Sequence, residues 1–431
     1  MGPPVTEVRR HLSWGMFAAY LMFGSGFLVS WNAIFSIANY WITRYPMRSP
    51  FSPQSQAQGK NSINLFTIVY LPVNPVTILI TTRWHSSMPT HTRIIVGYGG
   101  ATLCLATILL VTLAPGNDAS LAGTLAATGV CSILDAVSHP AMYAEAALRP
   151  PQYTRVLVLG ASLAGVVNNI LRIITMAAFD SEADGLANGA RIFLALAALC
   201  TGACTVLYPL LRRRGLLVEA GPGARLEAGE GEQDPDAEPV EKEGQEGPKP
   251  GKEDHAALAV APGEALQGRA AVLQVICDTW RLCVALILIY IVTLSIFPGV
   301  LVEDAHSSRL GGWYPIILVT IYNVGDMLGR ILPATFAALV WTGQNIILIS
   351  SSIRLLFLPA IIFFGVQVVP VMAVLTFLLG FSNGLFTSHA MAAGPSHVHP
   401  ILSDMAGSVM VLALIVGLNI GAGLSFLWLL E

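Results

Sequence analysis

Residues 313–333 read WYPIILVTIYNVGDMLGRILP, an apolar run that contains an aspartate and an arginine. A helix needs roughly 20 mostly apolar residues to cross the hydrocarbon core of a bilayer, and this run is long enough. Asp326 and Arg330 stand four positions apart, so they share one face of such a helix. A charge near the bilayer centre costs at least roughly 2.5–3.5 kcal/mol on insertion scales. Both residues should therefore point into a helical bundle and serve a function there, unless they form an ion pair that merely holds the helix in place.

The composition around this run excludes a water-soluble globular protein. Charged residues make up 11% of the 431 residues and hydrophobic ones 54%, whereas soluble domains carry about 25% charged residues. Thirteen of the 26 acidic residues lie between residues 215 and 268. The net charge of −3 therefore reflects the acidic residues of this segment rather than a charged protein surface, and it gives no indication of nucleic-acid binding. We therefore expect an integral membrane protein, whose apolar surface is surrounded by lipid rather than by water.

The apolar runs predict an all-α polytopic membrane protein with about eleven transmembrane helices. They occupy approximately residues 13–38, 62–82, 93–114, 119–143, 154–178, 190–211, 278–302, 313–341, 345–365, 367–393 and 402–429.

One long linker, residues 212–269, interrupts this series. It is rich in Gly, Pro and Glu, and such a composition cannot bury enough apolar surface to offset chain entropy. We expect it to be disordered and cytoplasmic. It divides the chain into an N-terminal bundle of six spans (1–211) and a C-terminal bundle of five (270–431).

The orientation follows from the basic residues in the short loops, which are enriched on the cytoplasmic side of membrane proteins. One set of span ends carries nine of them, and the other set carries five (Arg44, Arg48, Lys60, Arg191 and Arg309). This bias predicts a cytoplasmic N-terminus, and the odd number of spans then predicts an extracytoplasmic C-terminus.

Other polar side chains inside the apolar runs are candidate functional residues. Asp135 and His139 repeat the spacing of four positions immediately before Pro140. Trp31 and Asn32 lie in the outer half of the first run, although a single tryptophan near a membrane boundary is more often an interface anchor. Arg172 and Arg354 are further intramembrane charges. The six cysteines lack metal-ligand spacing, so we expect neither a metal site nor a cofactor.

Six stretches together resemble the equilibrative nucleoside transporter family (solute carrier family 29), and their wording is most similar to plant and algal members. Besides 313–333, they are GSGFLVSWNAIFSIANYW (24–41), LRIITMAAFDSEADGLANGA (171–190), VTLSIFPGVLVED (292–304), SIRLLFLPAIIF (352–363) and GFSNGLFTSHAM (380–391). They occur in the family's order and within its eleven-span layout, over nearly the whole chain apart from 212–269.

The resemblance implies a major-facilitator-like fold of two bundles with the ligand between them. It implies that Asp326 and Arg330 contact the ribose and that Trp31 lines the pocket for the base. It further suggests gating or packing roles for a second set of residues, namely Asn32, Arg172, Arg354, Asn383 and Thr387. The implied substrate is a nucleoside or a nucleobase.

The chain departs from the family where a glutamine usually contacts the nucleobase. Aligned on Tyr153, Gly160 and Gly165, that position falls on His139, whose neutral ring offers one donor and one acceptor but no amide fork. Asp135, one turn earlier, is present in plant relatives. Both side chains can titrate, so we regard them as candidate proton-sensitive groups.

Several alternatives stay open at this point. Transport by alternating access is either facilitative or coupled to protons. An intramembrane aspartyl protease using Asp135 and Asp326 would need a shared proton, and the GxGD context is absent because residues 323–326 read NVGD. A non-transporting membrane receptor has no supporting motif. The expected location is the plasma membrane, with the vacuolar or another internal membrane as the alternative.

Overall fold

The computed structural model describes residues 5–45, 65–67, 69–83, 88–178, 183–217, 269–296, 310, 313–336, 340–361, 363 and 368–427. This part of the chain is helical nearly throughout and contains no strand. Before the long linker lie α1 (Val5–Ser36), α2 (Ala38–Arg44), α4 (Val73–Arg83), α5 (Thr90–Val111), α6 (Asp118–Ala147), α7 (Pro151–Ala178) and α8 (Ala183–Arg213). After it lie α10 (Arg269–Ile296), α11 (Trp313–Thr335), α12 (Gln344–Ile353), α13 (Phe357–Ala360), α14 (Val369–Ala393) and α15 (Ser403–Leu427). Of the predicted linker, only 212–217 and 269 are described.

The all-α membrane fold predicted from the sequence is confirmed. Nine helices of the described chain are long and apolar enough to cross a membrane. The two remaining predicted spans, 62–82 and 345–365, are also helical where they are described, but they are interrupted. Large apolar side chains such as Leu103 and Leu199 lie exposed on the outside of the molecule, as lipid-facing side chains do.

Prolines explain both interruptions. The first of these spans turns at Leu71–Pro72, and α4 begins directly afterwards. In the second, residues Arg354–Leu356 form a 3-10 turn between α12 and α13. Pro359 lies just beyond that turn; a proline lacks the N–H of a helical hydrogen bond, and its ring clashes with the carbonyl four residues earlier.

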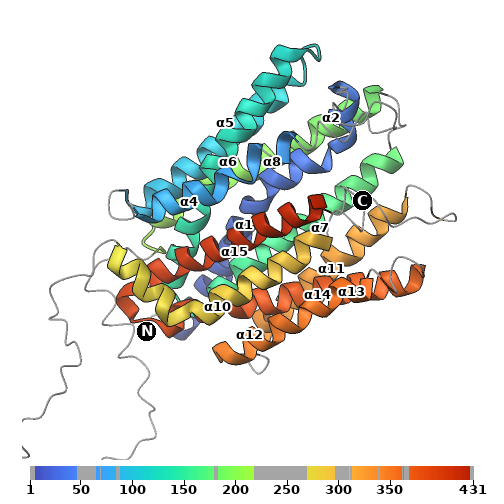
Figure 1. Cartoon of the computed structure of the whole chain (residues 1–431). Coiled ribbons are helices and arrows are strands. Elements are labelled where there is room, and N and C mark those ends of the chain that lie inside the picture. The colour runs from blue at the N-terminus through green and yellow to red at the C-terminus, as the bar shows by residue number, and fades with distance from the viewer. Residues whose placement is uncertain are drawn as a thin grey trace, which may run out of the picture.

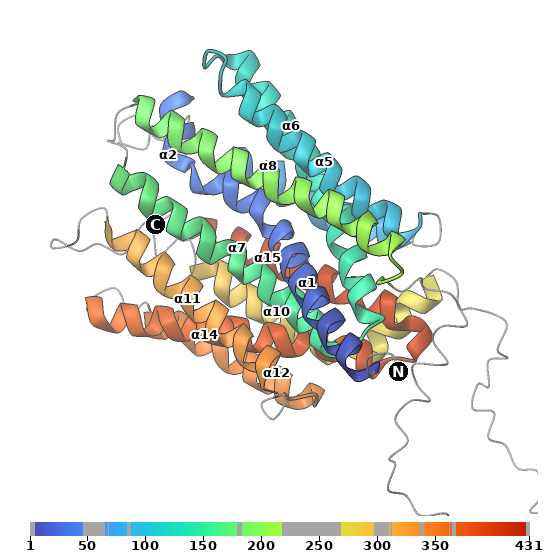
Figure 2. The ribbon, with the colours of Figure 1, turned by 180° about the vertical axis from the view of Figure 1, so that it is seen from behind.

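The helices before and after the linker form two bundles that pack side by side (Figures 1 and 2). In the first, α5 packs against α6 and α8, and α1 packs against α7. In the second, α10 packs against α15 and α11 against α14. The bundles meet where α7 contacts α11 and α14, and where α4 and α6 contact α15.

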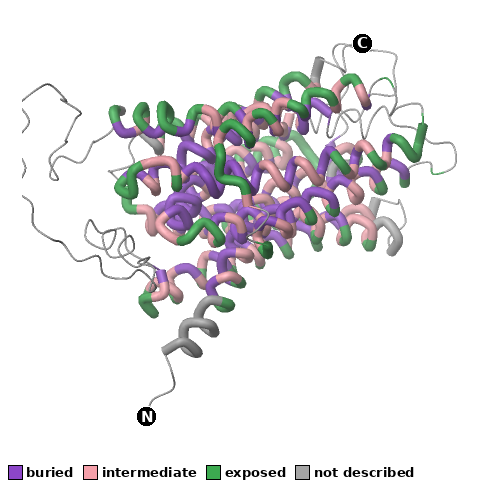
Figure 3. Tube along the Cα trace, turned by 90° about the horizontal axis from the view of Figure 1, so that it is seen from below, coloured by how far each residue is buried: buried purple, intermediate pink, exposed green. Residues whose placement is uncertain are grey.

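The two bundles are joined more closely at one end than at the other. We call the end where α1 begins the inner end and the end where α1 ends the outer end. A single hydrophobic core at the inner end takes residues from both bundles, among them Phe23, Leu157, Met391 and Met410. At the outer end each bundle has a core of its own. The core of the first bundle surrounds Trp41, and the core of the second bundle contains no residue of α1–α8. The buried residues accordingly gather where the bundles meet (Figure 3).

Close backbone contacts complete the inner closure. A Cβ atom at Gly407 of α15 would lie 2.6 Å from the carbonyl oxygen of Tyr143 in α6, so only glycine allows this approach. One residue later, the Ser408 hydroxyl donates a hydrogen bond to the Pro140 carbonyl at 3.4 Å. The inner ends of the bundles are thus packed against each other.

Candidate functional site

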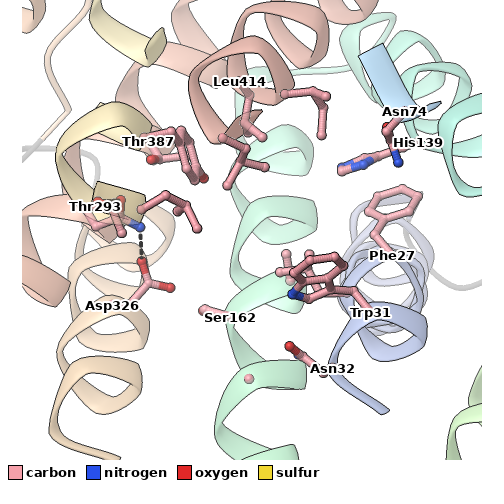
Figure 4. A pocket seen from close by; sticks show the side chains of 18 of the residues that line it. Phe27, Trp31, Asn32, Asn74, His139, Ser162, Thr293, Asp326, Thr387 and Leu414 are labelled. Carbon is pink, nitrogen blue, oxygen red and sulfur yellow. Dashed lines mark hydrogen bonds between the residues drawn. The ribbon is translucent and has the colours of Figure 1, made fainter. Parts of the chain in front are cut away.

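A cavity of about 200 Å³ lies between the two bundles. It is lined from the first bundle by α1, α6, α7 and the start of α4, and from the second by α10, α11, α14 and α15. Eight of the ten predicted site residues line it, namely Trp31, Asn32, Asp135, His139, Asp326, Arg330, Asn383 and Thr387. Figure 4 shows Asp326, Thr293 and Thr387 on one side of this space and Phe27, Trp31, Asn74 and His139 on the other.

Asp326 and Arg330 form a two-point ion pair on the α11 face that borders the cavity. Arg330 Nη2 donates to Asp326 Oδ1 at 3.1 Å, and Nε lies 3.0 Å from Oδ2. Each residue is only 5% exposed. Asn383 Nδ2 donates to the same Asp326 Oδ1 at 2.7 Å, so α14 fixes the carboxylate from a second helix.

This pair keeps hydrogen-bonding capacity for a ligand. Arg330 Nη1 also donates to the Val158 carbonyl in α7 at 2.8 Å, so two of its five N–H groups make hydrogen bonds, while Nε contacts Asp326 Oδ2 without forming one. Asp326 Oδ1 already accepts two bonds, whereas Oδ2 faces only Arg330 Nε among the described residues. Within this part of the chain, donors of Arg330 and the Oδ2 atom of Asp326 therefore remain available, and they suit neighbouring hydroxyl groups, each of which can donate and accept.

Arg354 does not line the cavity. It lies behind the wall that carries Asp326 and stabilises that wall through hydrogen bonds. It is buried, and its Nη2 donates to Thr293 Oγ1 at 2.8 Å and to the Leu379 carbonyl at 3.2 Å. Its Nη1 lies 3.3 Å from Asn383 Oδ1, which also accepts from the Thr293 hydroxyl at 2.9 Å. Arg354 thus orients Asn383, which in turn holds Asp326.

Arg172 is also remote from the cavity. Its Nη1 donates to the Ser36 carbonyl at the end of α1, at 2.8 Å, and thereby ties α7 to α1 at the outer end. Both arginines make hydrogen bonds between helices, and the gating or packing role suggested for them stays a prediction.

The opposite wall is aromatic. Trp31 stacks on Phe35 with 3.7 Å between ring centroids and meets Tyr70 at 4.8 Å. His139 stacks on Phe27 at 4.3 Å and contacts Tyr143 at 5.5 Å. Trp31 is therefore built into an aromatic cluster beside the cavity rather than standing alone as an interface anchor.

Asp135 connects this wall to the start of α4. The Tyr70 hydroxyl donates to Asp135 Oδ2 at 2.5 Å, and Cys131 Sγ lies 3.8 Å from the same oxygen. Asp135 and His139 both line the cavity one helical turn apart, as their spacing predicted.

A polar, ion-paired wall faces an aromatic wall between two bundles of transmembrane helices, and such a cavity suits a ligand with one polar and one aromatic half. Residues 125–430 match the sequence profile of a family described as "Nucleoside transporter". The chain belongs to this nucleoside transporter family. It is accordingly a multi-pass membrane transporter of nucleoside-type small molecules and not an enzyme.

Curated relatives support the plant-type resemblance. The chain is 29% identical over 419 residues to "Equilibrative nucleotide transporter 7" of Arabidopsis thaliana, an alignment that covers 94% of this chain and 93% of the relative. It is 28% identical over 425 residues to "Equilibrative nucleotide transporter 1" of the same plant, over 95% and 85% of the two chains.

Solved structures share the fold at low sequence identity. The fucose:proton symporter of E. coli superposes with a TM-score of 0.61 at 11% identity, covering 94% of this chain and 90% of that one. A bacterial homologue of the iron transporter ferroportin superposes with a TM-score of 0.57 at 10% identity, over 94% and 89% of the chains. The predicted major-facilitator-like architecture of two bundles is thereby confirmed.

The protease alternative fails on the family and also on geometry. Asp326 is ion-paired with Arg330 and hydrogen-bonded by Asn383, and among the described residues no second carboxylate contacts it to share a proton. Asp326 is instead one half of a charge pair with Arg330.

Sequence reasoning missed several residues that line the cavity. They are mostly aromatic or neutral amide side chains, namely Phe27, Tyr70, Asn74, Tyr143, Tyr290, Thr293, Tyr322, Asn323 and Asn419. A search for charges inside apolar runs does not detect them. The one usable signal was the sequence PVNP at 72–75, where an amide stands between two prolines inside an apolar run.

Proposed function

We propose that this protein carries nucleosides across the membrane by alternating access. In this proposal Asp326 and Arg330 bind the ribose hydroxyls, while Trp31 and His139 contact the nucleobase. The observation that carries it is the opposition of the two walls across one cavity, the ion pair on one side and the aromatic cluster on the other (Figure 4).

The chemistry of a nucleoside matches both walls. Its base has an apolar face that stacks on aromatic rings, and its sugar presents hydroxyl groups that both donate and accept hydrogen bonds. A site built to bond a hydroxyl discriminates strongly against an analogue that lacks it, because the buried partners are then left unpaired. The free donors of Arg330 and the open Oδ2 position of Asp326 would supply this discrimination.

The packing of the bundles favours alternating access. The inner ends share one core, whereas the outer ends have separate ones, which is the arrangement of an outward-facing transporter. An inward-facing state requires the inner contacts to break. One of these contacts, from Arg330 Nη1 to the Val158 carbonyl, is made by a residue of the proposed sugar site. Ligand binding and the opening of the inner end would thus both change the hydrogen bonds of Arg330.

Uptake of radiolabelled substrates into a transport-deficient host tests this function. We expect uptake of adenosine above the empty host, reduced uptake of 2′- and 3′-deoxyadenosine, and a smaller ratio between adenosine and its deoxy analogues in Asp326→Asn. The amide side chain keeps the shape of the carboxylate but loses its charge. An Asp326→Asn protein of normal abundance with an unaltered ratio would refute the sugar contact. Free adenine in the same assay decides whether nucleobases are also carried.

Proton coupling is a second candidate for the same transport cycle, and the observation that favours it is that Asp135 and His139 both line the cavity. Asp135→Asn is an informative variant because its amide oxygen can still accept the hydrogen bond from Tyr70. If transport is coupled through Asp135, this variant loses the sensitivity to a proton uncoupler that the unmodified protein has. Equal uptake with and without uncoupler in the unmodified protein would make transport facilitative.

A further inference from the structure

The segment that leads into α4 is fixed beside the cavity by two hydrogen bonds to α6. The Ser132 hydroxyl donates to the Tyr70 carbonyl at 2.6 Å, and the Tyr70 hydroxyl donates to Asp135 at 2.5 Å. The chain then turns at Leu71–Pro72 and starts α4 at Val73. Asn74 therefore stands in the first turn of a helix that begins at the cavity wall, in a position held by its neighbours.

The side chain of Asn74 carries a buried hydrogen-bond acceptor that no described residue satisfies. It is 5% exposed, it lines the cavity, and its Oδ1 has no hydrogen-bond partner among the described residues. A buried acceptor with no partner is unfavourable, so the site gains free energy when a ligand donor reaches it. Figure 4 shows Asn74 next to His139, at the end of the aromatic wall.

Other asparagines around the cavity are less suited to this role. The Asn383 amide donates to Asp326, and the Asn419 amide donates to the Ile415 carbonyl of its own helix at 2.9 Å. Asn32 has an unbonded Nδ2, but Trp31 lies between it and His139 (Figure 4). Asn323 lies on α11, the helix that carries Asp326 and Arg330, so Asn74 is the asparagine that adjoins the side proposed for the base.

We propose that Asn74 is a specificity-determining residue that binds the amino edge of an adenine-type base. Its Oδ1 accepts from the exocyclic amine, and its Nδ2 donates to the adjacent ring nitrogen, the paired geometry that asparagine forms with adenine. In this arrangement Phe27 and Trp31 contact the flat face of the base, and Asn74 at the start of α4 contacts its edge. This inference rests on the proposed function, because it assigns the base end of the same nucleoside site.

The test compares adenosine with purine riboside, which has the same ring and sugar but no 6-amino group. Competition against labelled adenosine gives the preference for adenosine over purine riboside. We expect Asn74→Leu, which conserves size and removes both polar atoms, to lower this preference by roughly 5- to 150-fold, the range for one paired base contact. The preference for adenosine over 2′-deoxyadenosine should stay as in the unmodified protein, since the sugar wall is untouched.

Asn419→Leu is the matched control. It removes an amide from the same cavity, but one that is bonded within α15, so it should leave the preference for adenosine over purine riboside unchanged. If the unmodified protein takes up no nucleoside, the proposed function itself fails. If it takes up adenosine and Asn74→Leu keeps the preference for adenosine over purine riboside, or loses both preferences equally, Asn74 does not bind the amino edge.

Discussion

At the scale of the residue, the Asp326 carboxylate is held from two helices, because Arg330 on its own helix and Asn383 on α14 both contact it. Removing one partner of a buried charge pair typically costs about 3–5 kcal/mol, since the remaining charge is uncompensated. We therefore expect Arg330→Ala to lower both the amount of protein in the membrane and the uptake of adenosine. Surface abundance of a tagged protein, measured beside uptake, separates the two losses.

A double replacement sharpens this prediction. Exchanging a whole buried pair for apolar residues of similar volume is often neutral or stabilising. Asp326→Leu combined with Arg330→Met should restore abundance to near that of the unmodified protein, while adenosine uptake stays absent because the hydroxyl partners are gone. A double variant that transports adenosine normally would reduce the pair to a structural role.

His139 gives a second prediction at this scale. Replacing it with glutamine introduces the residue that the family resemblance implies at this position, with an amide fork in place of one ring donor and one ring acceptor. We expect His139→Gln to change the ratio of purine to pyrimidine uptake. If this ratio stays unchanged, His139 serves only to stack on Phe27.

The sequence indicated some site residues and not others for a physical reason. Asp135, Asp326 and Arg330 stand out because a charge in an apolar run is expensive and needs a function or a partner. Asn74 carries no charge, and its importance depends on the turn at Leu71–Pro72, which brings it to the cavity wall. Which partners each side chain would find across the bundles could not be read from spacing along one helix.

At the scale of the element, paired glycines set how closely α11 and α14 approach. A Cβ atom at Gly325 or Gly329 would meet the backbone of α14, and one at Gly380 or Gly384 would meet the backbone of α11. Each helix thus presents two small residues four positions apart, the arrangement that allows membrane helices to pack backbone to backbone. This contact brings Asn383 within bonding distance of Asp326.

We expect Gly384→Val to destabilise the protein strongly, because its side chain would overlap the Asp326 carbonyl oxygen. Overpacking typically costs about 1–3 kcal/mol, and here the obstacle is backbone that has little room to move. Gly423→Val is the control, since nothing lies within 4 Å of a Cβ atom at that position. Thermal denaturation in detergent measures both, and equal melting temperatures would contradict the packing argument.

The elements themselves were largely predictable. Nine predicted spans correspond to helices of membrane-crossing length, because long apolar runs have no other stable form in lipid. The runs at 62–82 and 345–365 were predicted as single spans, but they are broken near Pro72 and Pro359. Hydropathy averages over a window and does not register where a proline interrupts the hydrogen bonds of a helix.

At the scale of the whole molecule, the unequal packing of the two ends is the property that the sequence could not supply. Apolar runs give the number of helices but not which ends share a core. The inner core joins both bundles through residues such as Leu157 and Met410, which are far apart in the chain. The proposed sugar site lies beside this junction, since Arg330 bonds Asp326 on its own helix and the Val158 carbonyl on α7.

The orientation in the membrane is the last prediction. In the structure α1 begins at the inner end and α15 finishes at the outer end (Figure 1), which is the arrangement expected for an odd number of crossings. In the sequence, the loops predicted on the N-terminal side carry nine basic residues against five on the other side, and the positive-inside rule therefore predicts that the inner end faces the cytoplasm. Epitope tags at Gly2 and Gly244 should be reached by antibody only after cells are permeabilised, whereas a tag at Glu431 should be reached on intact cells. Tags at Gly2 and Glu431 on one side would contradict the odd number of crossings, and the reverse pattern would contradict the charge argument alone.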